Sequence, residues 1–126
     1  MNKSSASSDK SSPNNPLNDT TASVQHLRDI VERFVAERNW HSFHNPKNLT
    51  MSLAIEVGEL MEHFQWLTLE EASVVKDDPQ RKHDVGEELV DCLSYLLSIA
   101  NTMDIDLTTA LEAKMIRNAE KYPAPR

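Results

Sequence analysis

The chain has 126 residues, which accommodates one domain with a core near the small end of the usual range. Only 2 residues are glycine and 6% are aromatic, while Leu, Ala and Glu are frequent, and this composition favours helices over short strands joined by tight turns. The formal net charge of −7 argues against binding to a nucleic-acid polymer, although metal ions would still allow a phosphorylated substrate to bind.

The cysteine content and the hydropathy pattern predict a soluble protein of the cytoplasm. Cys92 has no second cysteine with which to form an internal disulfide, which suits a reducing compartment. The polar N-terminus lacks the apolar stretch of a secretory signal. The longest apolar stretch, residues 92–103, is shorter than the roughly 18 residues of a membrane span. We therefore expect no membrane partner.

The composition divides the chain into a tail and one domain. Residues 1–22 are rich in Ser, Asn, Lys, Asp and Pro, so we expect a disordered tail that buries too little to offset its ordering entropy. Residues 23–123 form the predicted domain, and residues 124–126 a short C-terminal tail. The first helix is expected from Val24 to near Asn39, with Ser23 or Thr21 as its N-cap.

Residues 40–48 are predicted to form a loop, followed by a second helix from about Leu49 to Leu67. A short helix is expected after Thr68, because Thr68 and Glu71 have the spacing of a capping box. Asp78 directly before Pro79 predicts the start of the third long helix, which should end near Met103. Its expected inward side chains are Val85, Leu89, Leu93, Leu96, Ala100 and Met103.

A last helix is expected from after Asp106 to about Tyr122, where Pro123 ends it. The predicted fold is therefore all-α, a four-helix-bundle-like arrangement of four main helices and one short helix. Long apolar stripes in so small a chain also predict that helix faces pair with a second copy.

Two pairs of acidic residues are candidates for a metal site. Glu56 and Glu59 lie three apart on the second helix, and Glu88 and Asp91 lie three apart on the third, so each pair shares one helix face. If the two helices pack side by side, the four carboxylates converge and repel each other unless cations bind. Hard oxygen ligands favour magnesium, manganese or calcium, and magnesium commonly bridges to substrate phosphates.

Two alternatives compete with this interpretation. A Glu pair in an acidic chain is more often part of a solvated face, but both pairs here border predicted apolar stripes, which makes the two interpretations about equally good. A ferritin-like di-iron site needs Glu-x-x-His on two helices. Leu60 precedes His63 by three residues and Gln80 precedes His83, so the di-iron alternative is disfavoured.

Other candidate residues lie outside the acidic pairs. Side chains that suit phosphate oxygens share one face of the last helix: Lys114, Asn118 and either Lys121 or Tyr122. Side chains that suit a base are the aromatic residues Trp40, Trp66 and Tyr95, with His44 as a hydrogen-bonding group. Taken singly, each is more often a solvated or core residue. Cys92 is most simply a core thiol.

The order of these motifs resembles the MazG-like all-α nucleoside triphosphate pyrophosphohydrolases, and most closely their dCTP pyrophosphatase branch. Residues 56–59 (EVGE) and 88–91 (ELVD) resemble the metal-binding signature of that family. Residues 43–49, 64–66 and a C-terminal set over 114–123 resemble further motifs of the branch. Ile55 stands where the broad superfamily has a second acid, a departure that the dCTP branch shares and that disfavours its more distant branches.

The resemblance implies cleavage of a nucleoside triphosphate between its α and β phosphates. Glu56, Glu59, Glu88 and Asp91 would hold Mg²⁺, with Mn²⁺ as a substitute, and Glu59 would be the catalytic residue that assists deprotonation of water. The remaining candidates would bind substrate: His44, Trp40, Trp66, Tyr95, Lys114, Asn118, Lys121 and Tyr122. The resemblance also implies assembly as dimers or tetramers. Lys114 and Asn118 would then bind phosphate oxygens in the site of their own subunit or of a neighbouring one.

Two functions of different classes follow from the sequence. The first is hydrolysis of dCTP, a modified cytosine nucleotide, dUTP or a non-standard purine triphosphate. The second is a non-catalytic helical module whose acidic face binds a basic partner. Dependence on a divalent metal distinguishes the enzyme from the module.

Overall fold

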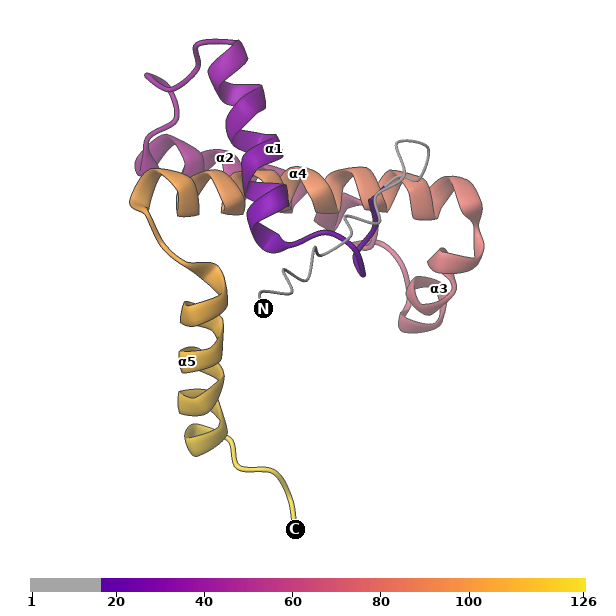
Figure 1. Cartoon of the computed structure of the whole chain (residues 1–126). Coiled ribbons are helices and arrows are strands. Elements are labelled where there is room, and N and C mark those ends of the chain that lie inside the picture. The colour runs from indigo at the N-terminus through magenta and orange to yellow at the C-terminus, as the bar shows by residue number, and fades with distance from the viewer. Residues whose placement is uncertain (1–16) are drawn as a thin grey trace, which may run out of the picture.

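The computed structural model describes residues 17–126, and that part of the chain is helical, without strands (Figure 1). The elements in chain order are α1 (Val24–Glu37), α2 (Pro46–Glu62), α3 (Leu69–Ser73), the 3-10 turn η1 (Val75–Asp77), α4 (Pro79–Met103) and α5 (Leu107–Lys121). Four long helices and one short helix confirm the predicted all-α class. Most of the predicted N-terminal tail lies outside the described residues.

Side-chain N-caps begin α1 and α4 at the expected places. The Ser23 hydroxyl accepts a hydrogen bond from the amide of His26 at 3.0 Å, which starts α1. The carboxylate of Asp78 accepts from the amides of Gln80 and Arg81 at the start of α4. Each cap satisfies amides that have no partner within the helix, and this explains why these boundaries could be predicted.

The bounds predicted for the second long helix were wrong at both ends. α2 starts at Pro46, because the Asn45 side chain accepts from the amide of Asn48 at 3.0 Å and Pro46 occupies the first helical position. The helix ends at Glu62, followed by turns in which the amides of Phe64 and Leu67 donate to the carbonyls three residues before them.

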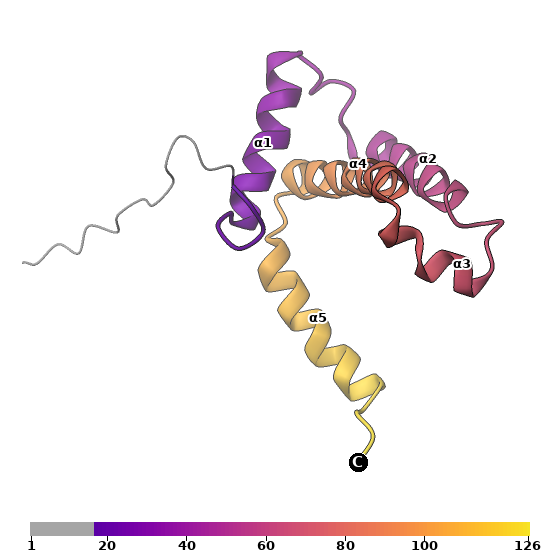
Figure 2. The same ribbon diagram turned by 90° about the vertical axis from the view of Figure 1, so that its right-hand side faces the viewer.

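Helices α2 and α4 lie side by side along much of their length, and α1 crosses α4 (Figures 1 and 2). The buried core comprises Val35 of α1, Leu49 of α2, Val75 of η1, and Cys92, Leu97, Ser98 and Ala100 of α4. Leu49 is 2% exposed, and burial of such a side chain contributes about 2 kcal/mol. The packing of α2 on α4 therefore brings the acidic segments of both helices together.

The predicted inward face of α4 was partly wrong. Ala100 is buried, but Leu89, Leu93, Leu96 and Met103 are exposed by 39% to 55%. The residues buried instead are Cys92, Leu97 and Ser98. Apolar residues occupy more than one side of α4, and α2 and α1 cover only part of that surface, so periodicity alone could not identify the covered side.

Helix α5 projects away from the other helices (Figures 1 and 2). Its direction changes after Asp104, which ends α4 in the left-handed conformation with φ 52°. Most residues of α5 are exposed, including Leu111, Met115 and Ile116. Residues 17–126 of one chain therefore do not form a closed bundle. Over residues 17–126, no helix has the length and apolar character needed to cross a membrane.

Candidate metal centre and adjoining cleft

Three of the four predicted carboxylates meet between α2 and α4. Glu56, Glu59 and Glu88 each offer an oxygen atom, and these atoms lie within 4.8 Å of one another. Glu56 and Glu59 share one face of α2 because they are three residues apart, and Glu88 faces them from α4. Three carboxylates at this separation match the oxygen-rich coordination that Mg²⁺ and Mn²⁺ favour.

The environment of Glu56 and Glu88 differs from that of ordinary surface glutamates. One oxygen of each, Oε2, is buried and has no hydrogen-bond partner. Desolvation, reinforced by the hydrogen bond and negative charge of Glu59, raises the pKa of Glu56 to about 7. Desolvation and the charge of Glu59 also raise the pKa of Glu88. Buried acceptors without donors are costly, so a cation would satisfy this cluster.

Asp91 is exposed and does not belong to the group of three. Its negative charge nevertheless contributes to the raised pKa values of Glu56 and Glu88, so it lies at the edge of the cluster. The charge of His63, at the end of α2, acts on Glu88 in the opposite direction. His63 was not among the site residues predicted from the sequence, although its position one turn after Glu59 was a usable signal.

A cleft of about 440 Å³ adjoins the cluster. Side chains from the loop before α2, from α2 and from α4 line it: Phe43, His44, Asn48, Leu49, Met51, Ser52, Ile55 and Tyr95. Ser52 lies one turn before Glu56, and Tyr95 lies one turn after Asp91, so the cleft continues along the same helix faces as the carboxylates. Ser52 was missed in the sequence because serine on a helix carries no specific signal.

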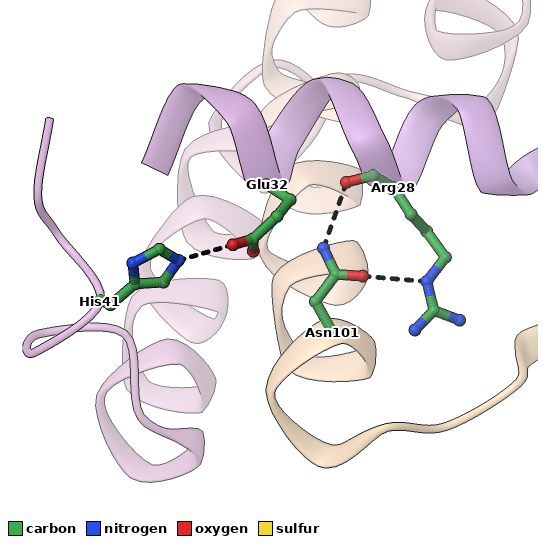
Figure 3. Close-up of polar contacts among 4 residues, drawn as sticks. All are labelled: Arg28, Glu32, His41 and Asn101. Carbon is green, nitrogen blue, oxygen red and sulfur yellow. Dashed lines mark hydrogen bonds and ion pairs between the residues drawn. The ribbon is translucent and has the colours of Figure 1, made fainter. Parts of the chain in front are cut away.

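His44 offers an unused polar atom in this cleft. Its Nδ1 is buried without a hydrogen-bond partner, and its ring stacks on that of Trp40 at 6.1 Å between centroids. The loop that carries both residues is tied to α1, because His41 Nε2 lies 2.6 Å from the Glu32 carboxylate (Figure 3). Trp40 also packs edge-on against Phe34 of α1. These contacts hold His44 at the cleft.

The structure does not bring every candidate residue to this place within one chain. Trp66 lies in the turns after α2 and is 86% exposed, and it does not line the cleft. The candidates of the last helix are on or next to α5, which projects away from α2 and α4 (Figure 2): Lys114, Asn118, Lys121 and Tyr122. Asn118 is half-buried, and the Lys121 ammonium lies 5.4 Å from the centre of the Tyr122 ring.

Comparison with known proteins places this geometry in a family. The model of the MazG-like family matches residues 51–126, which include all four acidic residues and α5. The chain belongs to the MazG-like family. Among curated proteins, this MazG-like chain is 41% identical to dCTP pyrophosphatase 1 of Homo sapiens over 101 residues and 40% identical to that of Bos taurus over 100 residues.

These alignments cover 80% and 79% of the MazG-like chain, and 59% of each relative. The chain therefore spans about three-fifths of the length of the curated relatives it matches. A solved structure of a pyrophosphatase from Archaeoglobus fulgidus superimposes with a TM-score of 0.75 at 37% identity. That match covers 86% of this chain and 100% of the archaeal chain, so the two share the fold throughout the smaller protein.

Proposed function

We propose that this chain is a magnesium-dependent nucleoside triphosphate pyrophosphohydrolase that converts dCTP or a modified dCTP to the monophosphate and pyrophosphate. The observation that carries the proposal is the cluster of Glu56, Glu59 and Glu88, with two buried and unpartnered carboxylate oxygens beside a cleft. The printed names of the relatives, dCTP pyrophosphatase 1 and pyrophosphatase, support the same reaction class.

In this proposal Glu56, Glu59, Glu88 and Asp91 hold the metal. Magnesium, or manganese in its place, would supply positive charge that neutralises the triphosphate oxygens in the transition state. The Oε2 atoms of Glu56 and Glu88 suit direct ligation, because they are buried and have no hydrogen-bond partner. Asp91, at the exposed edge of the cluster, would add a fourth negative charge that helps to balance the charge of the cation.

Glu59 is the candidate general base. It is exposed, and one of its carboxylate oxygens lies within 4.8 Å of those of Glu56 and Glu88. A carboxylate there can accept a proton from the water that attacks the triphosphate. The bond between the α phosphate and the bridging oxygen then breaks, and pyrophosphate leaves.

The cleft is the proposed nucleoside site. Phe43 and Tyr95 offer aromatic surface for a base, and His44 Nδ1 is available for a polar atom of the ligand. The Trp40 ring stacks on that of His44. The proposed contacts of Trp66, Lys114, Asn118, Lys121 and Tyr122 would come from a second copy in a homodimer or homotetramer, because one chain does not place these residues beside the cluster.

The decisive experiment measures pyrophosphate release from a panel of canonical and modified deoxynucleoside triphosphates, with Mg²⁺ and with a chelator. Turnover should require the metal and be greatest with cytosine nucleotides. Glu59→Gln and Asp91→Asn should lower kcat by about 100-fold or more without changing the helical circular dichroism. Glu87→Gln is the matched control, because Glu87 lines a different surface hollow and pairs with His83 at 2.9 Å.

Metal-independent turnover, or wild-type rates in both cluster variants, would contradict the proposed site. The absence of turnover with every nucleotide would contradict the enzyme itself. In that case the acidic face would be tested for binding to a basic partner, which should not depend on a divalent metal.

A further inference from the structure

The side chain of Arg28 joins three segments at the base of α5. Its Nη1 donates to the carbonyl of Ile105 at 2.5 Å, and its Nη2 donates to the carbonyl of Ala100 at 3.1 Å. Ile105 lies in the linker between α4 and α5, and Ala100 lies in the last turns of α4. Arg28 itself belongs to α1 and is half-buried. One guanidinium group therefore bonds α1 to α4 and to the linker.

Asn101 both accepts a hydrogen bond from Arg28 and donates one to it (Figure 3). Its Oδ1 accepts from Arg28 Nε at 2.9 Å, and its Nδ2 donates to the Arg28 carbonyl at 3.2 Å. The planar guanidinium thus uses three nitrogen atoms at once in a fixed geometry, which the ammonium of lysine cannot reproduce. Both residues are half-buried, so these bonds are less exposed to competition from water.

The linker depends on this junction because it is short and has few other contacts. The Ala100 carbonyl also accepts from the amides of Asp104 and Ile105, which closes the end of α4. The next residue, Asp106, caps α5. Its pKa lies below the usual range, mainly because of the hydrogen bond from the Thr109 amide, and the charge of Arg28 contributes in the same direction. Arg28 thus acts on both sides of the linker.

Within one chain, over residues 17–126, α5 has no polar junction of this kind farther along its length. Within residues 17–126, no hydrogen bond or ion pair joins α5 itself to α1, α2 or α4. Within one chain, no polar contact of α5 therefore opposes a change of angle at the linker, and the change reaches the far end of the helix. We propose that Arg28 is a positioning residue that fixes the direction in which α5 leaves the helical body, by bonding α1 to the end of α4 and to Ile105.

The kinetic consequence rests on the proposed function. Lys114 and Asn118 lie beyond the junction, so their placement at the carboxylate cluster of a second copy depends on the angle of α5. A small error in placing groups that bind the transition state reduces the rate by about 10- to 100-fold. Arg28 touches neither the cluster nor the cleft, so its effect is indirect.

The test is a distance measurement between spin labels on the full-length protein, at Glu37→Cys and Glu120→Cys. Both positions are exposed, near the far ends of α1 and α5, where a change of angle produces the largest displacement. Labelled protein is mixed with a large excess of unlabelled protein so that only pairs within one chain are observed. Arg28→Lys is compared with Arg33→Lys, an exposed arginine of the same helix.

We expect one narrow distance distribution in the parent protein and in Arg33→Lys, and a broad one in Arg28→Lys. Arg28→Lys should also lose about 10- to 100-fold in kcat/KM with its helical content preserved. A distribution in Arg28→Lys as narrow as that of the parent would overturn the proposal, even if the melting temperature fell. If Arg28→Lys does not fold, Asn101→Ala gives the same test, since it removes only the amide part of the junction.

The distance measurement does not require catalysis. A parent protein that hydrolyses no nucleotide would refute the proposed function and leave the role of Arg28 to be decided by the distances alone.

Discussion

Glu56 and Glu88 differ from ordinary surface glutamates in the burial of one carboxylate oxygen each. Each residue is only half-buried, yet its Oε2 is buried and unpartnered, and its pKa is raised by desolvation and by its acidic neighbours. Folding therefore brings together carboxylates that repel one another, and this repulsion destabilises the folded state. A cation that binds only the folded state removes this repulsion and must stabilise the protein.

We predict that Mg²⁺ raises the melting temperature of the wild-type protein in the absence of nucleotide. A ligand at 100 times its dissociation constant contributes about 2.7 kcal/mol, which corresponds to roughly 10 °C for a domain of this size. Glu88→Gln should show a smaller metal-induced shift and a higher melting temperature without metal, because one of the repelling charges is gone. The measurement is thermal unfolding with Mg²⁺ and with chelator.

Glu87→Gln is the control for this prediction and should retain the full metal-induced shift. Glu87 is the neighbour of Glu88 in sequence but pairs with His83 on another side of α4. Equal metal-induced shifts in wild type and Glu88→Gln would show that the metal binds elsewhere.

At the scale of elements, α3 is the shortest helix and depends on its capping box. Glu71 Oε1 accepts from the Thr68 amide at 2.9 Å, and Thr68 Oγ1 accepts from the Glu71 amide at 3.1 Å. The hydrogen bond from the Thr68 backbone holds the pKa of Glu71 below its ordinary value. A depressed pKa in the folded state means that the ionised carboxylate favours folding.

We predict that Glu71→Ala lowers the melting temperature near pH 7 by roughly 3 °C. The lowered pKa places this stabilisation above the unfolded value of about 4.5, and it is lost as the pH falls through the folded value. The difference between wild type and Glu71→Ala should therefore shrink below about pH 4.5. Glu70→Ala, in the same turn, should show a smaller difference with less dependence on pH. A difference that stays constant down to pH 3 would contradict the capping role.

Features of the fold that depend on contacts between residues close in sequence could be predicted, and those that depend on long-range contacts could not. Ser23, Thr68, Asp78 and Asp106 begin helices as predicted, because a cap needs only atoms a few residues away. Asn45 and Pro46 carry the same signal as Asp78 and Pro79, but the prediction placed both residues in a loop over residues 40–48 and so missed this helix start.

The candidate site was predictable in part for the same reason. The i, i+3 spacing places two acidic residues on one face of each helix, and this could be predicted. The pairing of α2 with α4 is a long-range contact and could not. In the structure three of the four acidic residues meet, and Asp91 lies at the edge of the group. The cleft could not be predicted, because it depends on where the loop before α2 lies. The departure of α5 depends on Arg28, whose partners are 72 to 77 residues away.

At the scale of the whole molecule, several apolar faces are left uncovered. Ile55 and Met61 of α2 are 65% and 57% exposed, Leu89 of α4 is 55% exposed, and Leu111 and Ile116 of α5 are 59% and 64% exposed. Side chains of this size on three helices exceed what monomeric proteins usually leave in contact with water. Coverage of these faces by a second copy would explain why so much apolar surface is exposed in one chain.

We predict that the protein is a homo-oligomer and that the apolar face of α5 contributes to the contact. Met115 lies one turn after Leu111 on that face and is 49% exposed. Met115→Glu would bury an unpaired charge in the contact, which should weaken association by about 10-fold or more and lower the mass measured by light scattering after size exclusion. Arg117→Glu changes an exposed polar position of the same helix and should leave the mass unchanged. A wild-type protein that is monomeric at all concentrations would contradict this prediction, and with it the supply of Lys114 and Asn118 from a neighbouring subunit.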